Sequence, residues 1–578
     1  MYSFRDLQKA CKKSVKGNEI RLAVLGNCAT QFFSQAVEGM GKLSGLNMSV
    51  YDVDYNQIEE QLLDSSSEVY SFEPDEILIW LGTEKIYEEY LDEDLAERGH
   101  FAKIYMQKIE HYWSLIAKNS NARIIQMNFS EIDDKAMGQY SCKVETTFTF
   151  QLRKLNFLLQ EAALQNNRVY LVDALAVQIG LGRDAYFNAP LYYNAKMPVA
   201  INALPFLAKA VVDVIKAMSG KIKKCVILDL DNTLWGGVIG DDGLAGIEIG
   251  ELGKGHVFSN FQRWLKQLKD YGIILAICSK NEEDTAKEPF EKHDEMVLSL
   301  SDISLFVANW NDKASNIKMI QESLNIGMDS IVFLDDNPFE RNLVKEKLPE
   351  IEVPELPEDP ALWLVFLQKQ NYFDTASYTA EGSDRTKLYQ AEYERKRLEQ
   401  TFETIDDYLQ SLKMEGTAKP FEPLKYARIA QLTQRSNQFN LRTVRYTEDE
   451  IQRIAEDEHF ITLYYTLKDK FGDHGLVSVV ILEKRSAEEL FVDTWLMSCR
   501  VLKRGMEEFI INRMVQTAAD CGFRIILAEY LPTPKNRMVK DIYETMGFSK
   551  TGENTYCLKV SDFQTLKTYI KEDDHGTE

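Results

Sequence analysis

The sequence predicts a multidomain α/β protein, and its length and two recurring patterns are the reasons. A chain of 578 residues is too long for one hydrophobic core, and roughly three domains of ordinary size are expected. From residue 20 to about residue 355, short apolar runs alternate with amphipathic stretches, which is typical of layered α/β domains. Beyond residue 421, several strands with fewer helices indicate an α+β domain.

Composition excludes several classes of function. The formal net charge of −23 argues against unspecific binding to nucleic acid or anionic membrane. No apolar run is long enough to span a bilayer, and the N-terminus lacks the apolar core of a signal peptide. The eight cysteines are scattered without a CxxC pair, which suits a reducing cytoplasm and opposes a zinc knuckle or a disulfide framework. We expect a cytoplasmic protein with no nucleic-acid or membrane partner.

The first predicted domain spans residues 1–218. Its expected strands are short, apolar and closed by polar residues, and an amphipathic helix is expected over 100–119. The strands are expected at residues 21–27, 75–82, 122–129 and 168–175. These elements predict an α/β layered domain.

The second predicted domain, residues 219–375, has four apolar runs that each end in a polar cluster. In a doubly wound parallel sheet the strand C-termini share one edge, where ligands bind. The pattern should therefore bring several carboxylates, one hydroxyl and one ammonium into a single crevice. Its members are Asp229, Asp231 and Thr233 after the first run, Ser279 after the second, Lys313 after the third, and Asp335 and Asp336 after the fourth.

This set of side chains suits phosphoryl transfer. Carboxylate oxygens are ligands that Mg²⁺ prefers, and a carboxylate can attack phosphorus to form an aspartyl-phosphate. A cation must offset the repulsion between that carboxylate and an anionic phosphate. Lys313 and Ser279 could then hold the phosphoryl oxygens where charge develops. Purely structural interpretations of these residues stay open. The aspartates could be turn residues at strand ends, Ser279 could be a helix cap, and Lys313 could be a surface lysine.

The ordered motifs resemble the haloacid-dehalogenase superfamily, whose first motif is DxDxT after an apolar strand; here it reads Asp229-Leu230-Asp231-Asn232-Thr233. The resemblance implies that Asp229 is nucleophile and metal ligand, and that Asp231 is general acid/base with its backbone carbonyl on the metal. It implies phosphate contacts from Thr233, Ser279 and Lys313, and further metal carboxylates at Asp335 and Asp336. The stretches between the motifs are too short for a large cap domain, so the site should be open to a large or protein-bound substrate.

The run DLDNTLWGGVIGDDG, residues 229–243, narrows the resemblance to the FkbH-like branch, a haloacid-dehalogenase phosphatase (subfamily IIIC type) fused to an acyltransferase-like domain. The third predicted domain, residues 421–578, supports it with AQLTQRSNQFNLRTVRY, KFGDHGLVSVVI and DTWLMSCRVLKRGME, and resembles the GNAT acyltransferase fold. Such proteins are associated with loading a glyceryl unit from a phosphorylated glycerate donor onto an acyl-carrier protein, with loss of phosphate. A carrier's phosphopantetheine arm, or CoA, is thus an implied partner.

The GNAT resemblance also implies an anion-binding segment before a helix. The family pattern R/Q-x-x-G-x-G/A is matched by Arg500, Lys503, Arg504 and Gly505, with Lys503 in place of the first glycine, and Tyr543 matches the family's late helix-turn segment. Cys499 and His474 are further candidates, because a thiolate beside a histidine can carry an acyl group as a thioester. A buried strand cysteine and a turn histidine remain the alternative.

The first domain resembles SGNH hydrolases through RLAVLGNCAT and IWLGTEK, with Cys28 in the serine position and Glu84 where asparagine would be. No histidine occurs between residues 111 and 256, so a histidine-based triad cannot be assembled there. A degenerate, non-hydrolytic binding or docking domain is expected. A role for Cys28 as acyl carrier or ligand contact stays open.

The resemblances together imply a doubly wound HAD-like Rossmannoid core, flanked by an SGNH-like α/β domain and a GNAT-like α+β domain. Residues 376–420 are expected to form a charged helical linker, and a turn at Gly472–Gly475 should join two strands of the third domain. We expect a Mg²⁺-dependent phosphatase, coupled to acyl loading onto a carrier protein. The alternatives are a stand-alone phosphatase of sugar or acid phosphates and a scaffold whose domains only bind.

Overall fold

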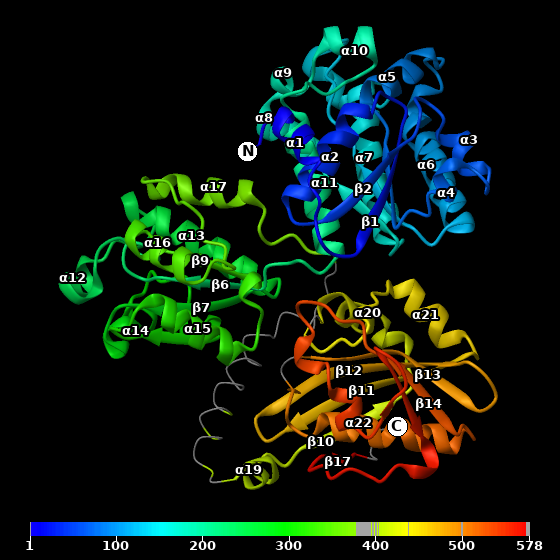
Figure 1. Ribbon diagram of the computed structural model, residues 1–578. Helices are drawn as coiled ribbons and strands as arrows, with labels where there is room; N and C mark the ends of the chain where they lie inside the picture. The colour runs from blue at the N-terminus through cyan, green and yellow to red at the C-terminus, as the bar shows by residue number, and fades with distance from the viewer. Residues whose placement is uncertain are drawn as a thin grey trace. The chain divides into compact units, whose positions relative to one another are not determined.

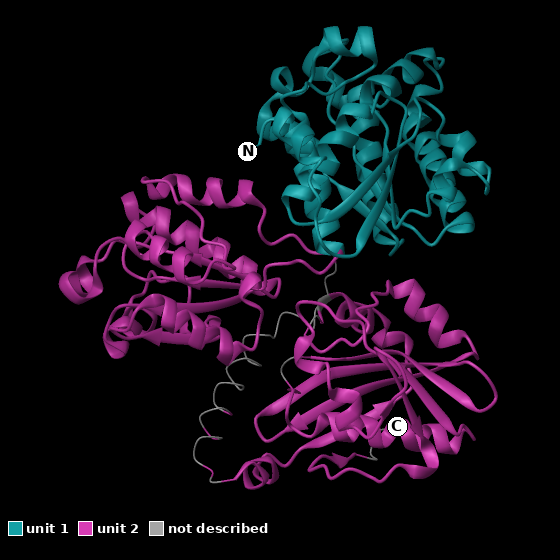
Figure 2. Ribbon diagram, viewed as in Figure 1, with its two compact units in different colours: residues 1–218 teal, residues 219–578 magenta. Residues whose placement is uncertain are grey.

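The computed structural model describes residues 2–376, 395, 398, 402, 404–436, 438–498 and 501–573. The chain divides into two compact units, residues 1–218 and 219–578 (Figure 2). The first unit contains one parallel sheet, and the second contains one parallel and one mixed sheet. The predicted multidomain α/β class is confirmed, while the predicted domain boundaries stay predictions.

The first unit is a five-stranded parallel sheet in the order β2-β1-β3-β4-β5 between two layers of helices (Figure 1). Its central strands are buried along their length, as parallel strands covered on both faces must be. The strands are β1 (Glu19–Gly26), β2 (Asn47–Asp52), β3 (Glu76–Trp80), β4 (Arg123–Met127) and β5 (Val169–Val172).

Helices α1, α2 and α11 pack together, and α6 packs with α3 and α7. Side chains of α6 and α7 form a core with β1, β3 and β4. The helices are α1 (Phe4–Ala10), α2 (Gln31–Leu43), α3 (Ile58–Leu63), α4 (Glu68–Ser71), α5 (Thr83–Asp92), α6 (Phe101–Asn119), α7 (Phe148–Leu164), α8 (Ala174–Leu181), α9 (Arg183–Tyr186), α10 (Ala189–Ala195) and α11 (Leu204–Met218).

The parallel sheet of the second unit has four strands in the order β8-β7-β6-β9. Helices α13 and α17 pack on one face, and α15 and α16 cover the other. The strands are β6 (Cys225–Leu228), β7 (Ile274–Ser279), β8 (Leu305–Ala308) and β9 (Ile331–Leu334). The helices are α12 (Ile239–Gly246), α13 (Gly253–Asp270), α14 (Glu283–Lys292), α15 (Lys313–Leu324), α16 (Pro338–Lys347) and α17 (Trp363–Gln370).

The mixed sheet of the second unit has the order β15-β16-β14-β13-β12-β11-β10-β17. Helix α22 packs on one face, and α20 and α21 cover the other. The strands are β10 (Glu415–Lys419), β11 (Phe460–Asp469), β12 (Gly472–Lys484), β13 (Glu489–Met497), β14 (Ile525–Glu529), β15 (Ser549–Lys550), β16 (Thr555–Lys559) and β17 (Lys571–Glu572). The helices are α19 (Ile405–Ser411), α20 (Tyr426–Arg435), α21 (Glu448–Glu456), α22 (Met506–Asp520) and α23 (Ile542–Thr545).

Two local expectations differ from the structure. Lys470 and Phe471 form the loop between β11 and β12; Gly472 is already the first residue of β12, and Gly475 lies inside it at φ 64° beside a register shift. The expected turn at Gly472–Gly475 is therefore a β-bulge next to a tighter hairpin. Within the expected linker 376–420, α19 and β10 belong to the mixed sheet and its core, because Tyr408, Leu409 and Leu412 are buried there.

Candidate active site

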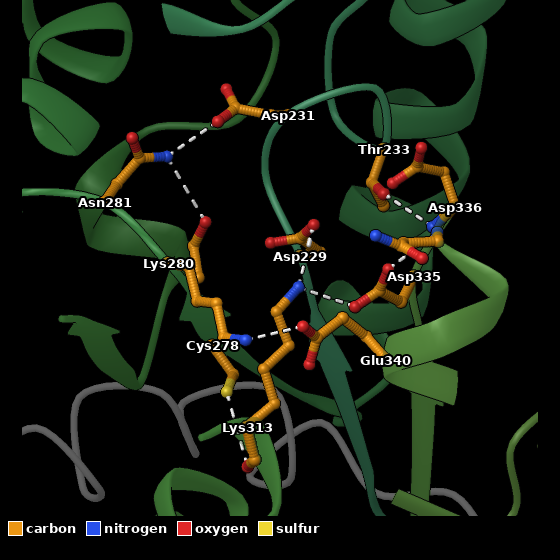
Figure 3. Close-up of polar contacts among 12 residues, drawn as sticks. Asp229, Asp231, Thr233, Cys278, Lys280, Asn281, Lys313, Asp335, Asp336 and Glu340 are labelled. Atoms are coloured by element: carbon orange, nitrogen blue, oxygen red, sulfur yellow. Dashed lines mark hydrogen bonds and ion pairs between the residues drawn. The ribbon is translucent and has the colours of Figure 1, made fainter. Parts of the chain in front are cut away.

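The chemistry-bearing residues of the parallel sheet in the second unit meet at its carboxyl edge (Figure 3). Asp229 directly follows β6, Ser279 ends β7, and Asp335 and Asp336 directly follow β9. Lys313 is the first residue of α15, five residues beyond the end of β8. All four strands run in parallel, so their ends converge at one place, as the sequence pattern predicts.

Lys313 lies between two carboxylates. Its Nζ is 2.9 Å from Asp229 Oδ2 and 2.6 Å from Asp335 Oδ2. Burial alone would lower the pKa of Lys313, but the charges of Asp229 and Asp335 outweigh burial and raise it well above its ordinary value. The lysine is thus a permanent cation, and it is not the surface lysine of the alternative interpretation.

Three carboxylates could hold a metal ion. Asp229, Asp335 and Asp336 each offer an oxygen, and these oxygens lie within 4.8 Å of one another. Burial, reinforced by the charge of Asp229, raises the pKa of Asp335 to about 6 and raises that of Asp336. Crowded buried carboxylates need more positive charge than one lysine supplies. Oxygen donors of this kind fit Mg²⁺.

Asp231 is held apart from this triad by three donors. Its Oδ1 accepts from the Ile239 N–H at 2.9 Å and from Trp235 Nε1 at 3.0 Å, and its Oδ2 accepts from Asn281 Nδ2 at 2.8 Å. The carboxylate is therefore fixed in direction, as a proton-transferring group must be. Asn281, which also lies 3.4 Å from Ser279 Oγ, was not anticipated. Its place two residues after Ser279 was the only sequence signal.

Other side chains fix the loops around the carboxylates. The Thr233 hydroxyl accepts from the backbone N–H of Asp336 at 3.2 Å, which ties the loop after β6 to the loop after β9. The buried Arg341 donates to the carbonyls of Asp335 and Asp336 at 2.8 and 2.6 Å. Thr233 thus has a positioning contact besides its expected phosphate contact, and Arg341 is a supporting residue that the sequence analysis missed.

The rim of this edge carries exposed aromatic side chains. Trp310, after β8, is 68% exposed, and Phe339, after β9, is 69% exposed. The indole Nε1 of Trp310 donates to Glu282 Oε1 at 2.6 Å, so the ring has a defined orientation. β8 and β9 are the two outer strands of this sheet, and Asp229 follows the inner strand β6. Trp310 and Phe339 therefore follow strands on either side of the strand that carries Asp229.

The acyltransfer candidates lie in the mixed sheet, and Cys499 and Arg500 fall outside the described residues. His474, on β12, is buried, and its Nε2 is 3.1 Å from Asp469 Oδ2. Arg504 is also buried, with Nη1 3.7 Å from the same oxygen. His474 is therefore part of a buried polar cluster and not an exposed turn residue.

The segment before α22 differs from an open anion site. Gly505 is the N-cap of α22 at φ 78°, and Lys503 stands at φ 61°. The backbone N–H of Lys503 donates to Glu507 Oε1 at 3.0 Å, so a buried carboxylate already occupies this end of the helix. Tyr543 is buried in the core of the mixed sheet.

In the first unit, Cys28 follows β1 and Glu84 lies in α5, after β3. β1 and β3 are neighbours in the sheet, so the two residues belong to the same carboxyl edge. Burial, with the charge of Glu84, raises the pKa of the Cys28 thiol, and burial raises the pKa of Glu84 to about 7. A thiol of raised pKa is a poor nucleophile, which supports the expectation that this domain does not hydrolyse esters.

The comparison with solved structures identifies the class of protein. The chain is 43% identical to the N-terminal part of BF1531 from Bacteroides fragilis, described as containing a phosphatase domain and complexed with Mg; the match covers 65% of this chain and 100% of that one, with a TM-score of 0.62. The site geometry and this similarity define an enzyme with a phosphatase domain.

The model of the FkbH N-terminal domain matches residues 21–216. The chain belongs to the FkbH family, which confirms the resemblance inferred from the motifs. No curated protein matches the chain by sequence.

Acetyltransferase structures match the C-terminal quarter only weakly. Spermidine N-acetyltransferase from Vibrio cholerae, in complex with CoA and spermine, is 14% identical over 25% of this chain and 96% of its own, with a TM-score of 0.21. At that identity and TM-score no activity follows. Among the described residues, none of the helices is both long and apolar enough to cross a membrane.

Proposed function

We propose that this protein is a Mg²⁺-dependent phosphatase of the haloacid-dehalogenase type that works through an aspartyl-phosphate on Asp229. The observation that supports this most directly is the contact of Lys313 with both Asp229 and Asp335, next to the third carboxylate, Asp336. Magnesium in the related BF1531 structure supports the choice of metal. Asp229, Asp335 and Asp336 would hold the ion, which supplies positive charge toward the phosphoryl group.

The chain's own residues divide the chemistry between them. A carboxylate oxygen of Asp229 attacks phosphorus, and Lys313 and Ser279 hold phosphoryl oxygens as charge develops. Asp231 gives a proton to the leaving oxygen and later takes one from the water that hydrolyses the aspartyl-phosphate. The three donors on Asp231 keep it directed for both steps. Asp231 could place its backbone carbonyl on the ion, as the resemblance implies.

We propose further that phosphate removal is coupled to loading a glyceryl or similar acyl group onto a carrier protein. The donor is a phosphorylated three-carbon or related acid, and Cys499 carries the acyl group as a thioester, with His474 as its base. Arg500, Lys503, Arg504, Gly505 and Tyr543 are the proposed contacts for the phosphopantetheine arm. A carrier arm fits better than the diphosphate of CoA, because Glu507 already accepts from the Lys503 N–H.

The second candidate is a stand-alone phosphatase of a sugar or acid phosphate, in surface-polysaccharide or secondary-metabolite biosynthesis. The exposed Trp310 and Phe339 at the rim of the site favour it, since aromatic rings could contact the leaving group directly. In either case we propose a cytoplasmic protein whose first unit is an SGNH-like domain that binds without hydrolysing. The described cysteines are all free, which suits that compartment.

Intact-protein mass spectrometry separates the two candidates. The chain is incubated with Mg²⁺ and a phosphorylated glyceryl donor, and any adduct is mapped by peptide. A persistent acyl adduct on Cys499 that is absent from Cys499→Ala supports loading. Phosphate release without an adduct on any cysteine contradicts loading and leaves the phosphatase, for which a panel of sugar and acid phosphates is the next experiment.

A further inference from the structure

The two oxygens of the Asp231 carboxylate have different surroundings. Each oxygen of an ionised carboxylate can accept about two hydrogen bonds. Oδ1 accepts two, from the Ile239 N–H at 2.9 Å and from Trp235 Nε1 at 3.0 Å. Oδ2 accepts one from the part of the chain that the structure describes, from Asn281 Nδ2 at 2.8 Å. Oδ2 is therefore the oxygen that still has a lone pair for a proton.

A proton on Oδ1 would disrupt the site, whereas a proton on Oδ2 would not. On Oδ1 it would displace either the backbone N–H of Ile239 or the indole N–H of Trp235, and both residues are buried. A buried donor that loses its partner costs much more free energy than a hydrogen bond exchanged with water. On Oδ2 the proton takes a lone pair that no described donor uses.

Asn281 connects Oδ2 to the end of β7. Its amide nitrogen carries two hydrogens and lies 2.8 Å from Asp231 Oδ2 and 3.4 Å from Ser279 Oγ. Figure 3 shows the Asn281 amide directed at Asp231. Because a carboxylate only accepts hydrogen bonds, the nitrogen of the amide must face Asp231. A Ser279 hydroxyl that accepts from this amide keeps its own hydrogen for a phosphoryl oxygen.

The Asn281 side chain is held by protein on several sides. The residue is 5% exposed and lies between β7 and α14. A Cβ added to Gly240, at the start of α12, would be 3.9 Å from Asn281 Oδ1, so α12 begins beside the amide. The loop after β7 and the start of α12 thus hold opposite oxygens of the Asp231 carboxylate, through Asn281 and the Ile239 N–H.

We propose that Asn281 is a positioning residue that directs Oδ2 of Asp231 at the leaving oxygen, so that both proton transfers pass through Oδ2. This inference rests on the phosphatase function proposed above and assigns its proton transfers to one atom. Asn281 acts through Asp231 and does not itself take or give a proton. Trp235 and the Ile239 N–H hold Oδ1 on the other side, which keeps the carboxylate from turning over.

Protons and electron pairs balance over the two steps. In the first, an oxygen of Asp229 bonds to phosphorus as the bond to the leaving oxygen breaks, and that oxygen takes the proton from Asp231 Oδ2. In the second, Oδ2 takes a proton from water as the water oxygen attacks phosphorus, and the electron pair of the breaking P–O bond returns to Asp229. Asn281 can donate to Oδ2 throughout, because a protonated carboxyl oxygen still has a lone pair.

The dependence of the rate on the leaving group tests this without knowledge of the natural substrate. The leaving oxygen of phenyl phosphate needs a proton, whereas the weakly basic nitrophenolate leaves p-nitrophenyl phosphate without one. Asn281→Leu nearly keeps the side-chain volume and removes the donor. It should lower kcat/KM for phenyl phosphate by about 10 to 100-fold, the effect of one hydrogen bond to a charged group. For p-nitrophenyl phosphate the loss should stay below about threefold.

Two further variants show whether Asn281 acts through Asp231. Asp231→Asn should have the same dependence on the leaving group, and adding Asn281→Leu to it should lower kcat/KM for phenyl phosphate no further. Asn316→Leu is the matched control. The buried Asn316 also donates across loops of this domain, to Asn309 Oδ1 at 2.9 Å, and its loss should leave the ratio of the two kcat/KM values unchanged.

The outcomes separate this inference from the function on which it rests. Equal losses with the two esters, or no loss with phenyl phosphate, would overturn the positioning role while the phosphatase function stands. Circular dichroism shows whether Asn281→Leu is folded, and Asn281→Ala gives the same comparison if the leucine does not fit. If the unmodified chain with Mg²⁺ hydrolysed neither ester, the proposed phosphatase function would fail, and this inference with it.

Discussion

Lys313 is the residue on which the phosphoryl-transfer site depends. Asp229 and Asp335 both contact its Nζ, and without that cation two buried carboxylates would face each other. The geometry therefore joins the proposed nucleophile Asp229, the cation Lys313 and the proposed metal ligand Asp335 in one buried cluster. A substitution there should affect chemistry before it affects the fold, provided that shape and hydrogen bonding are kept.

Asp229→Asn should abolish phosphatase activity while the chain stays folded, because an amide cannot form the acyl-phosphate that a carboxylate forms. The expected loss in kcat is at least about 10³-fold. Activity is measured as phosphate release and folding as the thermal melting curve. Asp294→Asn, at an exposed aspartate of the same sheet domain, is the matched control and should keep full activity. Turnover in Asp229→Asn would remove Asp229 from the nucleophile role.

Mg²⁺ affinity should fall as the pH falls below about 6. Burial and the charge of Asp229 raise the folded-state pKa of Asp335 to about 6, so below that pH a proton competes with the ion for this carboxylate. Each pH unit below 6 should cost about tenfold in affinity. Isothermal titration calorimetry at pH 7.5 and pH 5 measures this. Equal affinities at the two pH values would contradict Asp335 as a ligand, and Asp335→Asn should bind weakly at both.

At the scale of elements, helix α15 presents Lys313 as its first residue. Asp312 is the N-cap: its side chain accepts from the Ser315 N–H at 3.1 Å and from the Ser315 hydroxyl at 2.6 Å. The cap thus fixes the start of the helix next to the cluster of Asp229, Lys313 and Asp335.

Asp312→Ala should lower the free energy of unfolding of the phosphatase domain by about 1 kcal/mol, whereas Asp312→Asn keeps a capping oxygen and should lose less. The hydroxyl of Ser315, more than any other group, lowers the pKa of Asp312 to about 2 from 3.8. The stabilisation by this charge is therefore present above pH 4 and is lost as the pH falls toward 2. Urea titrations at pH 7 and pH 3 measure both effects. If Asp312→Ala and Asp312→Asn lost the same free energy of unfolding, Asp312 would not act as a helix cap.

The sequence predicted the elements whose patterns are local and missed those that depend on distant partners. The four buried strands of the phosphatase sheet and their terminal carboxylates were visible because apolar runs end in polar clusters. β2 was missed because it has only one fully buried residue. β10 was missed because it lies in a charged segment and has no apolar pattern of its own. It joins the sheet by pairing with β11. Asn281 and Arg341 were missed because their roles appear only when separate loops meet.

The pairing of β10 predicts where a stable C-terminal fragment can begin. A fragment starting at residue 421 loses α19 and β10, which exposes β11 and removes Tyr408, Leu409 and Leu412 from the core. A fragment starting at residue 404 keeps them. The longer fragment should melt at a higher temperature and stay in solution, whereas the shorter should aggregate through its exposed strand edge. Circular dichroism and size-exclusion chromatography compare the two fragments. Equal melting temperatures would show that α19 and β10 do not stabilise this domain.

At the scale of the whole molecule, the described part of the chain combines separate hydrophobic cores with a proposed metal site at Asp229, Asp335 and Asp336. The first unit, the parallel sheet and the mixed sheet each have their own buried cluster. A chain built this way should not unfold in a single two-state step. The formal net charge of −23 should keep the chain soluble. It should also repel an acidic partner, so the affinity for such a partner should depend strongly on the salt concentration.

Calorimetry should therefore resolve more than one unfolding transition. Mg²⁺ should raise the midpoint temperature of only the transition that belongs to the phosphatase domain. An ion that binds the folded state alone stabilises it by about 2.7 kcal/mol at a concentration of 100 times its Kd. Asp335→Asn should abolish that shift and leave the other transitions in place, because Asp335 directly follows β9 of the parallel sheet in the second unit and belongs to the carboxylate cluster there. EDTA should reverse the shift and remove phosphatase activity together. If Mg²⁺ raised the midpoint temperatures of all transitions equally, the domains would be thermodynamically coupled. If it raised none of them while activity persisted in EDTA, the carboxylate cluster would not be a metal site.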